Sequence, residues 1–125
     1  MKTKFSSSWK SSKKQSKQRK YRINAPLHIK QKLVSSHLSK ELRKKHNKRN
    51  VILRKGDKVK VMQGNFKKYE GKVERVDLGS TRVYVSGVEY AKKDGTKKML
   101  PLNPSNLMIT ELNMDDKLRR KILEK

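Results

Sequence analysis

The clearest pattern along the chain is an alternation of apolar and polar residues in its second half. Residues 58–61, Lys-Val-Lys-Val, put two valines on one face of an extended segment and two lysines on the other. Residues 82–85, Arg-Val-Tyr-Val, repeat this period. The dipeptide at 94–95, Asp-Gly, has lysines on both sides and predicts the tip of a hairpin that runs from residue 88 to 100. From residue 51 onward the pattern therefore predicts short strands with one apolar face.

These strands predict a small barrel. Val73 and Val76 are three residues apart, which breaks the alternation and indicates a bulge or a strong bend, and residues 107–109 supply a last strand. Five short strands in about sixty residues favour a closed sheet, because closure removes exposed strand edges. The predicted fold class is mainly β, a five-stranded barrel with short flanking helices. Its predicted core consists of Val59, Val61, Val73, Val76, Val83, Val85, Val88, Leu100, Leu107 and Ile109.

Residues 24–50 favour two short helical pieces. Asn24 suits a helix cap with a proline in the first turn, and Ile29 and Leu33 lie one turn apart on one face. Serines at 35, 36 and 39 interrupt the pattern, after which Leu38 and Leu42 resume the four-residue spacing. The apolar stripe is narrow, so we expect these helices to pack on the barrel or on a partner.

The two ends of the chain have different character. Residues 113–125 suit a helix capped by Asn113, with acidic residues at its start and basic ones after them. Residues 1–23 contain few large apolar side chains and cannot offset the entropy of ordering them, so we predict disorder in the free protein. We divide the chain into a basic extension at 1–23, a helical basic segment at 24–50, the barrel at 51–112 and a C-terminal helix at 113–125.

The charge of the chain narrows the choice of partner. Its 35 Lys and Arg residues outnumber 11 Asp and Glu residues and leave a net charge of +24 in 125 residues. Residues 1–50 hold seventeen basic residues and one acidic residue, so about two thirds of the charge lies in the first half. Such a charge opposes compaction unless a polyanion shares the structure, which indicates nucleic acid as the partner.

Other classes of protein find little support in the sequence. No run approaches the roughly twenty apolar residues of a membrane span, and no secretory signal follows the first lysines, so we expect no membrane and no secretion. Cysteine is absent, and His28, His37 and His46 are nine residues apart, so they could not converge on a metal from one helix. No phosphate-binding glycine loop or nucleophile motif occurs. We expect no enzyme, no cofactor and no metal.

Residues 54–77, with the run RKGDKVKVMQGNFKKYEGKVERVD, resemble the KOW motif. Together with NAPLH, SKELR, PSN and MITEL in the same chain order, they resemble the universal large-subunit ribosomal protein twenty-four family of archaeal and eukaryotic type, over about residues 15–125. The resemblance implies an SH3-like barrel in a structural protein of the cytoplasmic ribosome. It implies binding to the 5′ region of large-subunit ribosomal RNA, early in assembly and near the polypeptide exit tunnel.

The implied partners are large-subunit ribosomal RNA and neighbouring large-subunit proteins, and we expect no homo-oligomer. The alternative is a KOW-type transcription elongation or chromatin module that binds peptide or nucleic acid. A peptide-binding aromatic cage needs three or more convergent rings. The predicted barrel offers Phe66, Tyr69, Tyr84 and Tyr90 for this purpose.

The loop between the glycines at 64 and 71 is the foremost candidate for RNA contact. Lys67 and Lys68 suit phosphates, whereas Phe66 either stacks on RNA or plugs the end of the barrel. The family loop commonly reads Gly-Asp-Phe-Lys-Gly, but here Asn65 and Lys68 replace the acid and the second glycine, which puts the loop geometry in question. The predicted RNA-binding residues are Lys17, Arg19, Lys20, Arg22, His28, Lys30, Lys32, Arg43, Lys44, Lys45, His46, Lys48, Arg49, Arg54, Lys55, Lys58, Lys60, Gly64, Asn65, Phe66, Lys67, Lys68, Lys72, Arg82, Lys92, Lys93, Lys97 and Lys98.

Overall fold

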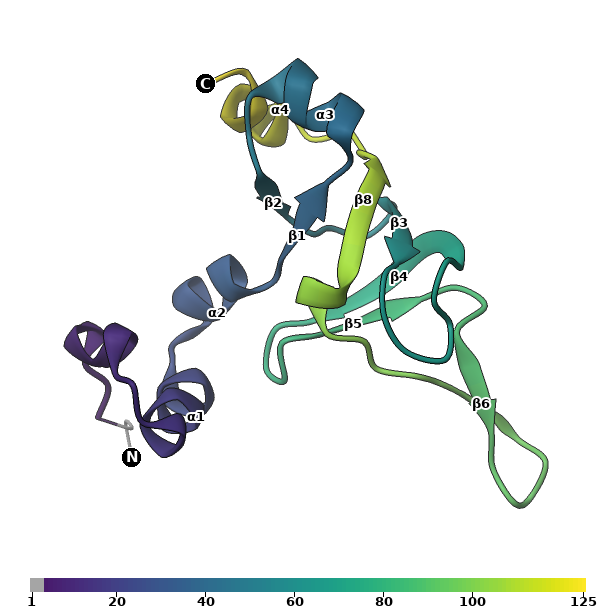
Figure 1. Ribbon diagram of the computed structural model, residues 1–125, viewed down its shortest axis with the longest axis horizontal. Helices are drawn as coiled ribbons and strands as arrows, with labels where there is room; N and C mark the ends of the chain where they lie inside the picture. The colour runs from purple at the N-terminus through teal and green to yellow at the C-terminus, as the bar shows by residue number, and fades with distance from the viewer. Residues whose placement is uncertain (1–3) are drawn as a thin grey trace.

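The computed structural model describes residues 4–125, so the first three residues of the predicted extension lie outside the described part. The molecule is elongated (Figure 1), with the N-terminal helices at one end, a sheet in the middle and a protruding hairpin at the other end. Helices α3 (Lys40–His46) and α4 (Lys117–Glu124) lie together beside the sheet.

The described residues form short helices and short strands. The helices are the 3₁₀ helix η1 (Ser7–Ser11), α1 (Gln15–Asn24), α2 (Leu27–Leu33), α3 (Lys40–His46), the 3₁₀ helix η2 (Pro104–Asn106) and α4 (Lys117–Glu124). The strands are β1 (Ser35–Leu38), β2 (Asn50–Ile52), β3 (Lys58–Val61), β4 (Glu70–Asp77), β5 (Arg82–Val85), β6 (Glu89–Ala91), β7 (Lys97–Met99) and β8 (Leu107–Glu111).

The main sheet is open, so the prediction of a closed five-stranded barrel is wrong. Six strands pair in the order β2-β1-β8-β3-β4-β5, and β6 pairs only with β7 in a separate hairpin. The sheet continues beyond β8 because β8 pairs in parallel with β1, which pairs in turn with β2. Strands β2 and β5 form the two edges of the sheet and do not pair with each other. Leu102 covers part of the free edge of β5 by exchanging two backbone hydrogen bonds with Val83, at 2.8 and 2.9 Å.

Strand β1 lies between α2 and α3, where the sequence suggested only an interruption between two helical pieces within residues 24–50. Val34, Ser36 and Leu38 are buried at alternate positions, and the Ser36 hydroxyl donates to the Pro104 carbonyl at 2.5 Å. A buried serine with a hydrogen-bond partner can occupy a core-facing position. Because Ser36 is polar, the sequence does not show the two-residue apolar period that is typical of a strand. Helix α2 contains Ile29 and Leu33 one turn apart, as expected, but it begins at Leu27. Asn24 is the last residue of α1 and does not cap α2.

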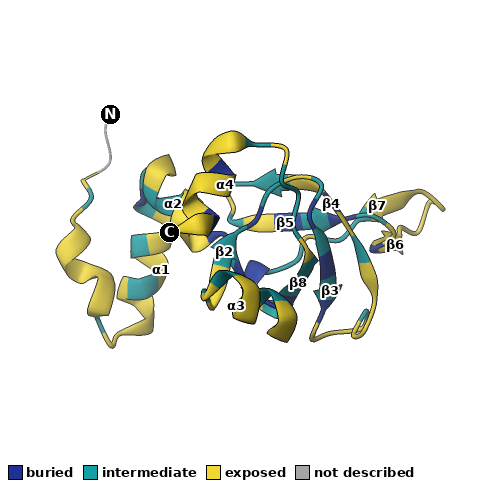
Figure 2. Ribbon diagram, turned by 90° about the horizontal axis from the view of Figure 1, so that it is seen from above, coloured by how far each residue is buried: buried dark blue, intermediate teal, exposed yellow. Residues whose placement is uncertain are grey.

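The hydrophobic core lies on one face of the main sheet, as the two-residue period predicted. All ten predicted residues belong to it, although Val76 and Leu100 are only partly buried. The sequence pattern missed Val34, Leu38 and Leu53, which the upstream strands and their connections contribute. The predicted irregularity in β4 is present as a register shift between Val73 and Arg75. Figure 2 shows buried positions along the strands and mostly exposed positions in the N-terminal helices and the β6–β7 hairpin.

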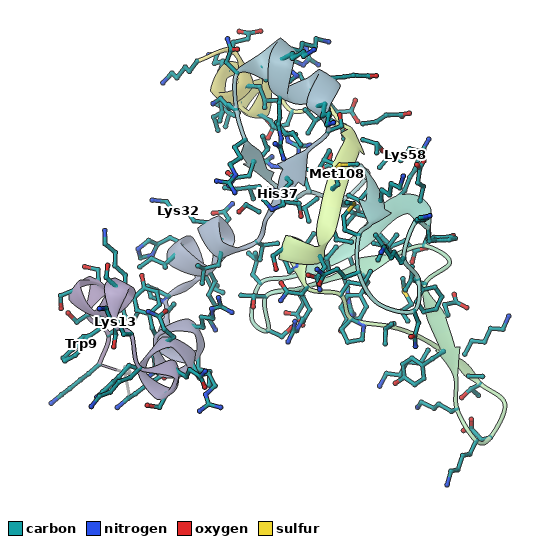
Figure 3. The ribbon with its side chains drawn as sticks, in the orientation of Figure 1. Trp9, Lys13, Lys32, His37, Lys58 and Met108 are labelled. Carbon is teal, nitrogen blue, oxygen red and sulfur yellow. The ribbon has the colours of Figure 1, made fainter. Side chains whose placement is uncertain are left out.

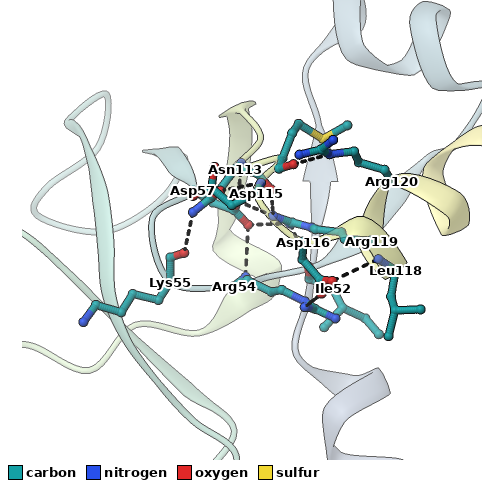
Figure 4. A network of polar contacts seen from close by, with 11 residues as sticks. Ile52, Arg54, Lys55, Asp57, Asn113, Asp115, Asp116, Leu118, Arg119 and Arg120 are labelled. Carbon is teal, nitrogen blue, oxygen red and sulfur yellow. Dashed lines mark hydrogen bonds and ion pairs between the residues drawn. The ribbon is translucent and has the colours of Figure 1, made fainter.

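The last helix is fixed to the sheet by a buried ion pair (Figure 4). Arg119 of α4 and Asp57, which precedes β3, are 3% and 0% exposed, and their paired atoms lie 2.5 and 2.6 Å apart. Asp57 also accepts from the backbone of Arg54 and Asn113, at 3.0 and 2.8 Å. The helix begins at Lys117 with Asp116 as its cap, so the expected start at Asn113 is wrong. Asn113 instead belongs to the network around the pair.

The N-terminal extension contains local structure in its described residues. Helices η1 and α1 cover much of residues 4–24, and neither contains a buried residue. Short helices without buried apolar faces gain little from tertiary packing. Disorder of this segment in the free protein therefore stays a prediction.

Candidate nucleic-acid interface

The loop between β3 and β4 is a compact turn that turns its lysines outward. Lys68 has a left-handed backbone conformation with φ 73°, and its N–H donates to the Val61 carbonyl at 2.8 Å. The Lys67 N–H donates to the Gly64 carbonyl at 3.2 Å. Both lysine side chains are exposed. The loop thus keeps a conformation that favours glycine and gains a charged side chain at that position.

The aromatic residues of this loop contact the protein. Phe66 is partly buried and packs against the core, as the structural alternative expected. The Tyr69 hydroxyl donates to the Ser86 carbonyl at 3.1 Å, which holds the loop to the end of β5. These contacts favour a structural role for both rings, and stacking of Phe66 on RNA stays a prediction.

The polar face of β3 and β4 carries both signs of charge. Lys58 lies opposite Lys72 in the register, and its ammonium is 3.4 Å from a carboxylate oxygen of Glu111 on β8. Lys60 lies opposite Glu70. Figure 3 shows Lys58 at the outer side of the sheet. Because the carboxylates share this face, it is a weaker anion site than the loop.

The β6–β7 hairpin presents an exposed basic tip, as the sequence predicted. Lys92 and Lys93 precede the turn, and Lys97 and Lys98 follow it, and all four are exposed. The Asp94 carboxylate accepts from the side chain and the backbone of Thr96, at 2.7 and 3.1 Å, and these bonds lower its pKa. The tip projects away from the sheet (Figures 1 and 2). Its lysines can therefore reach a surface that the sheet does not touch.

Several predicted RNA-binding residues also hold the fold together. The Lys30 ammonium donates to the Gly79 carbonyl at 3.0 Å, and Arg43 Nε donates to the Leu38 carbonyl at 3.0 Å. Lys48 donates to the Ile122 carbonyl at the end of α4. Lys30 and Lys48 join elements that are distant in sequence, and Arg43 joins α3 to the strand directly before it, so part of their charge serves the fold.

Arg54 has a protein partner as well. It forms an ion pair with Asp116, the residue that caps α4. The pKa of Asp116 is lowered, first by the hydrogen bond from the Leu118 N–H and then by Arg54. The neighbouring Lys55 is exposed and accepts a side-chain hydrogen bond from Asn113 through its backbone carbonyl at 3.3 Å.

The remaining predicted residues lie at separate places along the chain. Residues 17–22 lie in α1 and residues 28–32 in α2, and Lys44, Lys45 and His46 form the last turn of α3. Three different elements hold the three histidines: α2, β1 and α3. Within residues 4–125, no group of three or more His, Cys, Asp or Glu residues is placed to hold a metal ion.

Sequence reasoning missed an aromatic cluster in the N-terminal extension. The rings of Phe5 and Tyr21 lie 5.0 Å apart, and the Lys17 ammonium is 5.2 Å from the centre of the Trp9 ring. These residues line a cleft of about 290 Å³ together with Lys20. Three aromatic residues in an otherwise serine- and lysine-rich stretch were the available signal. Such rings next to ammonium groups suit stacking on unpaired bases.

Fold and charge together place the chain among small, basic, sheet-centred proteins whose loops and extensions reach a polyanion. The sequence matches the family of eukaryotic ribosomal proteins L26 and their archaeal counterparts L24 over residues 12–125, so the chain belongs to this family. The resemblance found in the sequence is thereby confirmed. The chain is a ribosomal protein of the large subunit, with a place in translation and RNA binding. None of the described helices is long and apolar enough to cross a membrane.

Proposed function

We propose that the chain is a structural component of the large ribosomal subunit that binds the 5′ region of large-subunit ribosomal RNA. Binding takes place early in assembly and near the polypeptide exit tunnel, in cytoplasmic ribosomes. The family membership supports a structural rather than an enzymatic role. Neighbouring ribosomal proteins of the same subunit are the other partners.

The observation that carries this proposal is the separation of the basic clusters. The β3–β4 loop, the β6–β7 tip and α1 are exposed, and they lie at different places on an elongated molecule. A compact ligand could not touch all three. A folded RNA offers phosphates over the whole length, and each neutralised phosphate releases counterions. We therefore propose that the predicted basic residues in these clusters contact phosphates.

The alternative, a peptide-binding module with an aromatic cage, has less support. Phe66 packs against the core, and the Arg75 guanidinium lies 4.2 Å from the ring centre of Tyr84. Tyr69 bonds to Ser86, and Tyr90 lies on the separate hairpin. Each ring has a different neighbour, whereas a cage requires rings that face one ligand.

Salt-dependent binding tests the proposal. Full-length protein is titrated into the isolated 5′ region of large-subunit RNA, and an equally long 3′ fragment serves as the control. If about six to ten phosphates are neutralised, affinity for the 5′ fragment falls by roughly three to five decades between 50 and 200 mM salt. Preference for the 5′ fragment at physiological salt supports the proposal. Equal affinity for both fragments, or affinity independent of salt, contradicts it.

A further inference from the structure

Three arginines from two distant parts of the chain line one cleft. Arg19 and Arg22 come from α1, and Arg82 begins β5. The cleft has a volume of about 300 Å³, and no acidic residue is among those that line it. Three like charges around one cleft repel each other, so the arrangement is favourable when an anion lies between them.

Within residues 4–125, the guanidinium groups of these three arginines have no hydrogen-bond, ion-pair or cation–π partner, unlike those of most other arginines. Of the nine arginines, five contact another group through the guanidinium within residues 4–125, and they are Arg43, Arg54, Arg75, Arg119 and Arg120. Among the described residues, Arg19, Arg22, Arg49 and Arg82 have no such contact. Three of these four line the cleft. Free guanidinium groups with several donors each are suited to bidentate contact with phosphate.

The turn that carries Arg82 is held in place by local hydrogen bonds. Asp77 accepts from the backbone of Gly79 at 3.0 Å and of Ser80 at 3.4 Å, and the Gly79 carbonyl accepts from Lys30 of α2 at 3.0 Å. Helix α2 follows α1 directly in the chain. The Lys30 bond therefore links α2, which follows α1, to the turn on the other side of the cleft. Because disorder of residues 1–23 is predicted for the free protein, nucleotide binding is expected to order α1 against this turn.

The rest of the cleft supplies a hydrogen-bond donor and an apolar wall. The side-chain oxygen of Asn103 accepts from the backbone and the hydroxyl of Ser105, at 3.2 and 2.9 Å, which leaves its amide nitrogen free to donate. Ile23 and Leu33, which are 72% and 36% exposed, also line the cleft. Groups that donate hydrogen bonds to phosphate, next to exposed aliphatic side chains, match the phosphate and the base or ribose of a nucleotide.

We propose that this cleft binds one unpaired nucleotide of RNA. Its phosphate lies among the guanidinium groups of Arg19, Arg22 and Arg82, and its base or ribose lies against Ile23 and Leu33. A paired base is stacked within a helix and could not reach an apolar wall, so the nucleotide is one from a loop, bulge or end. The volume of about 300 Å³ is at the small end of ligand sites and suits a single nucleotide. The inference rests on the proposed RNA-binding function and assigns one site within it.

A mononucleotide titration tests the cleft without the large RNA. Full-length protein, labelled with ¹⁵N, is titrated at low salt with adenosine 5′-monophosphate, inorganic phosphate and adenosine in parallel, and arginine Nε–H signals are followed by NMR. We expect the monophosphate to shift the signals of Arg19, Arg22 and Arg82 with an affinity several-fold higher than that of inorganic phosphate. Adenosine alone is expected to bind weakest, because charge-assisted bonds supply most of the affinity.

Three single variants separate the contribution of the cleft from that of charge alone. R82A is expected to weaken monophosphate binding roughly tenfold, the size of one lost charge-assisted contact. R120A removes a guanidinium that lies outside the predicted RNA-binding residues and does not line the cleft, and it is expected to leave the affinity within about twofold. R82K keeps the charge but loses bidentate geometry, so its affinity should lie between those of wild type and R82A. Circular dichroism spectra verify that each variant folds.

The outcomes separate this inference from the proposed function. Equal shifts at Arg120, equal loss in R82A and R120A, or equal affinity for inorganic phosphate and the monophosphate would overturn the nucleotide site. Binding of the 5′ RNA fragment could persist in each of those cases, and the proposed function would then stand without the cleft. Conversely, a specific monophosphate site in a protein without preference for the 5′ fragment would support the cleft and contradict the proposed RNA target.

Discussion

Lys68 combines a strained backbone with a position in the proposed RNA contact, which allows stability and binding to be separated. Its φ of 73° lies in the left-handed region, where a side chain with a Cβ atom costs about 1 kcal/mol or more relative to glycine. Glycine increases the entropy of the unfolded chain, which offsets part of that gain. We expect Lys68→Gly to stabilise the free protein by about 0.5–1 kcal/mol.

A gain of this size should raise the melting temperature by about 2–5 °C in a domain of this length. Lys68→Ala is the matched control, since it removes the same charge but keeps the Cβ atom and the strain. Thermal unfolding at one pH and salt concentration compares the three proteins. Both variants should bind the 5′ RNA fragment more weakly than wild type. The slope of log affinity against log salt concentration should be shallower by about the amount of one phosphate contact. The reasoning is refuted if Lys68→Gly is no more stable than Lys68→Ala.

Three further predictions concern the fold that supports the interface. Arg119→Met leaves Asp57 buried without its ion partner and should cost about 3–5 kcal/mol in urea unfolding, whereas Arg120→Met on the exposed side of α4 should cost below about 1 kcal/mol; similar costs would argue against the buried pair. Gly71→Ala places a Cβ atom 2.8 Å from the Ser86 carbonyl oxygen and should lower stability by about 1–3 kcal/mol, and Gly79→Ala, whose nearest atom is 3.4 Å away, should be close to neutral; equal effects would refute the close approach of β4 and β5. The pKa of Asp116 lies below its ordinary value of 3.8 because of the Leu118 N–H and Arg54. Its contribution to stability is therefore complete above the unfolded-state pKa and is lost as the pH falls through the folded-state pKa. Asp116→Asn should lack this loss of stability at acid pH, and identical acid-unfolding curves for the variant and the wild type would contradict the prediction.

The strands of the second half could be predicted because their side chains follow the two-residue period. Val59, Val61, Val83 and Val85 are buried on one face, as that period requires. The bulge in β4 was predictable for the same reason, since a break in the period has few other causes. Patterns of this kind lie within a few residues of each other in the chain.

The architecture of the sheet could not be predicted in the same way. Ser36 faces the core and is satisfied by a carbonyl 68 positions away, so its strand looked like an interrupted helix. Without β1, strand β8 would be an exposed edge of the sheet, and closure into a barrel would be the way to protect it. Once β1 and β2 extend it, the edge lies elsewhere and the barrel is not needed to protect β8.

The residues of the candidate interface could also be predicted only in part from the sequence. Basic residues of the loop and the hairpin tip are exposed, as their positions in turns predicted. The sequence could not show that Arg54 and Lys30 have protein partners, because those partners are distant in the chain. The gathering of α1 arginines with Arg82 likewise depends on how α2 meets the β4–β5 turn.

The most direct test of the central claim is ultraviolet crosslinking of the full-length chain to RNA in cells, followed by purification of large subunits and sequencing of the attached RNA. The account predicts crosslinks concentrated in the 5′ region of large-subunit RNA, with crosslinked peptides from the β3–β4 loop, the β6–β7 tip and the N-terminal helices. Crosslinks spread evenly over the RNA, or confined to regions outside its 5′ part, would contradict it.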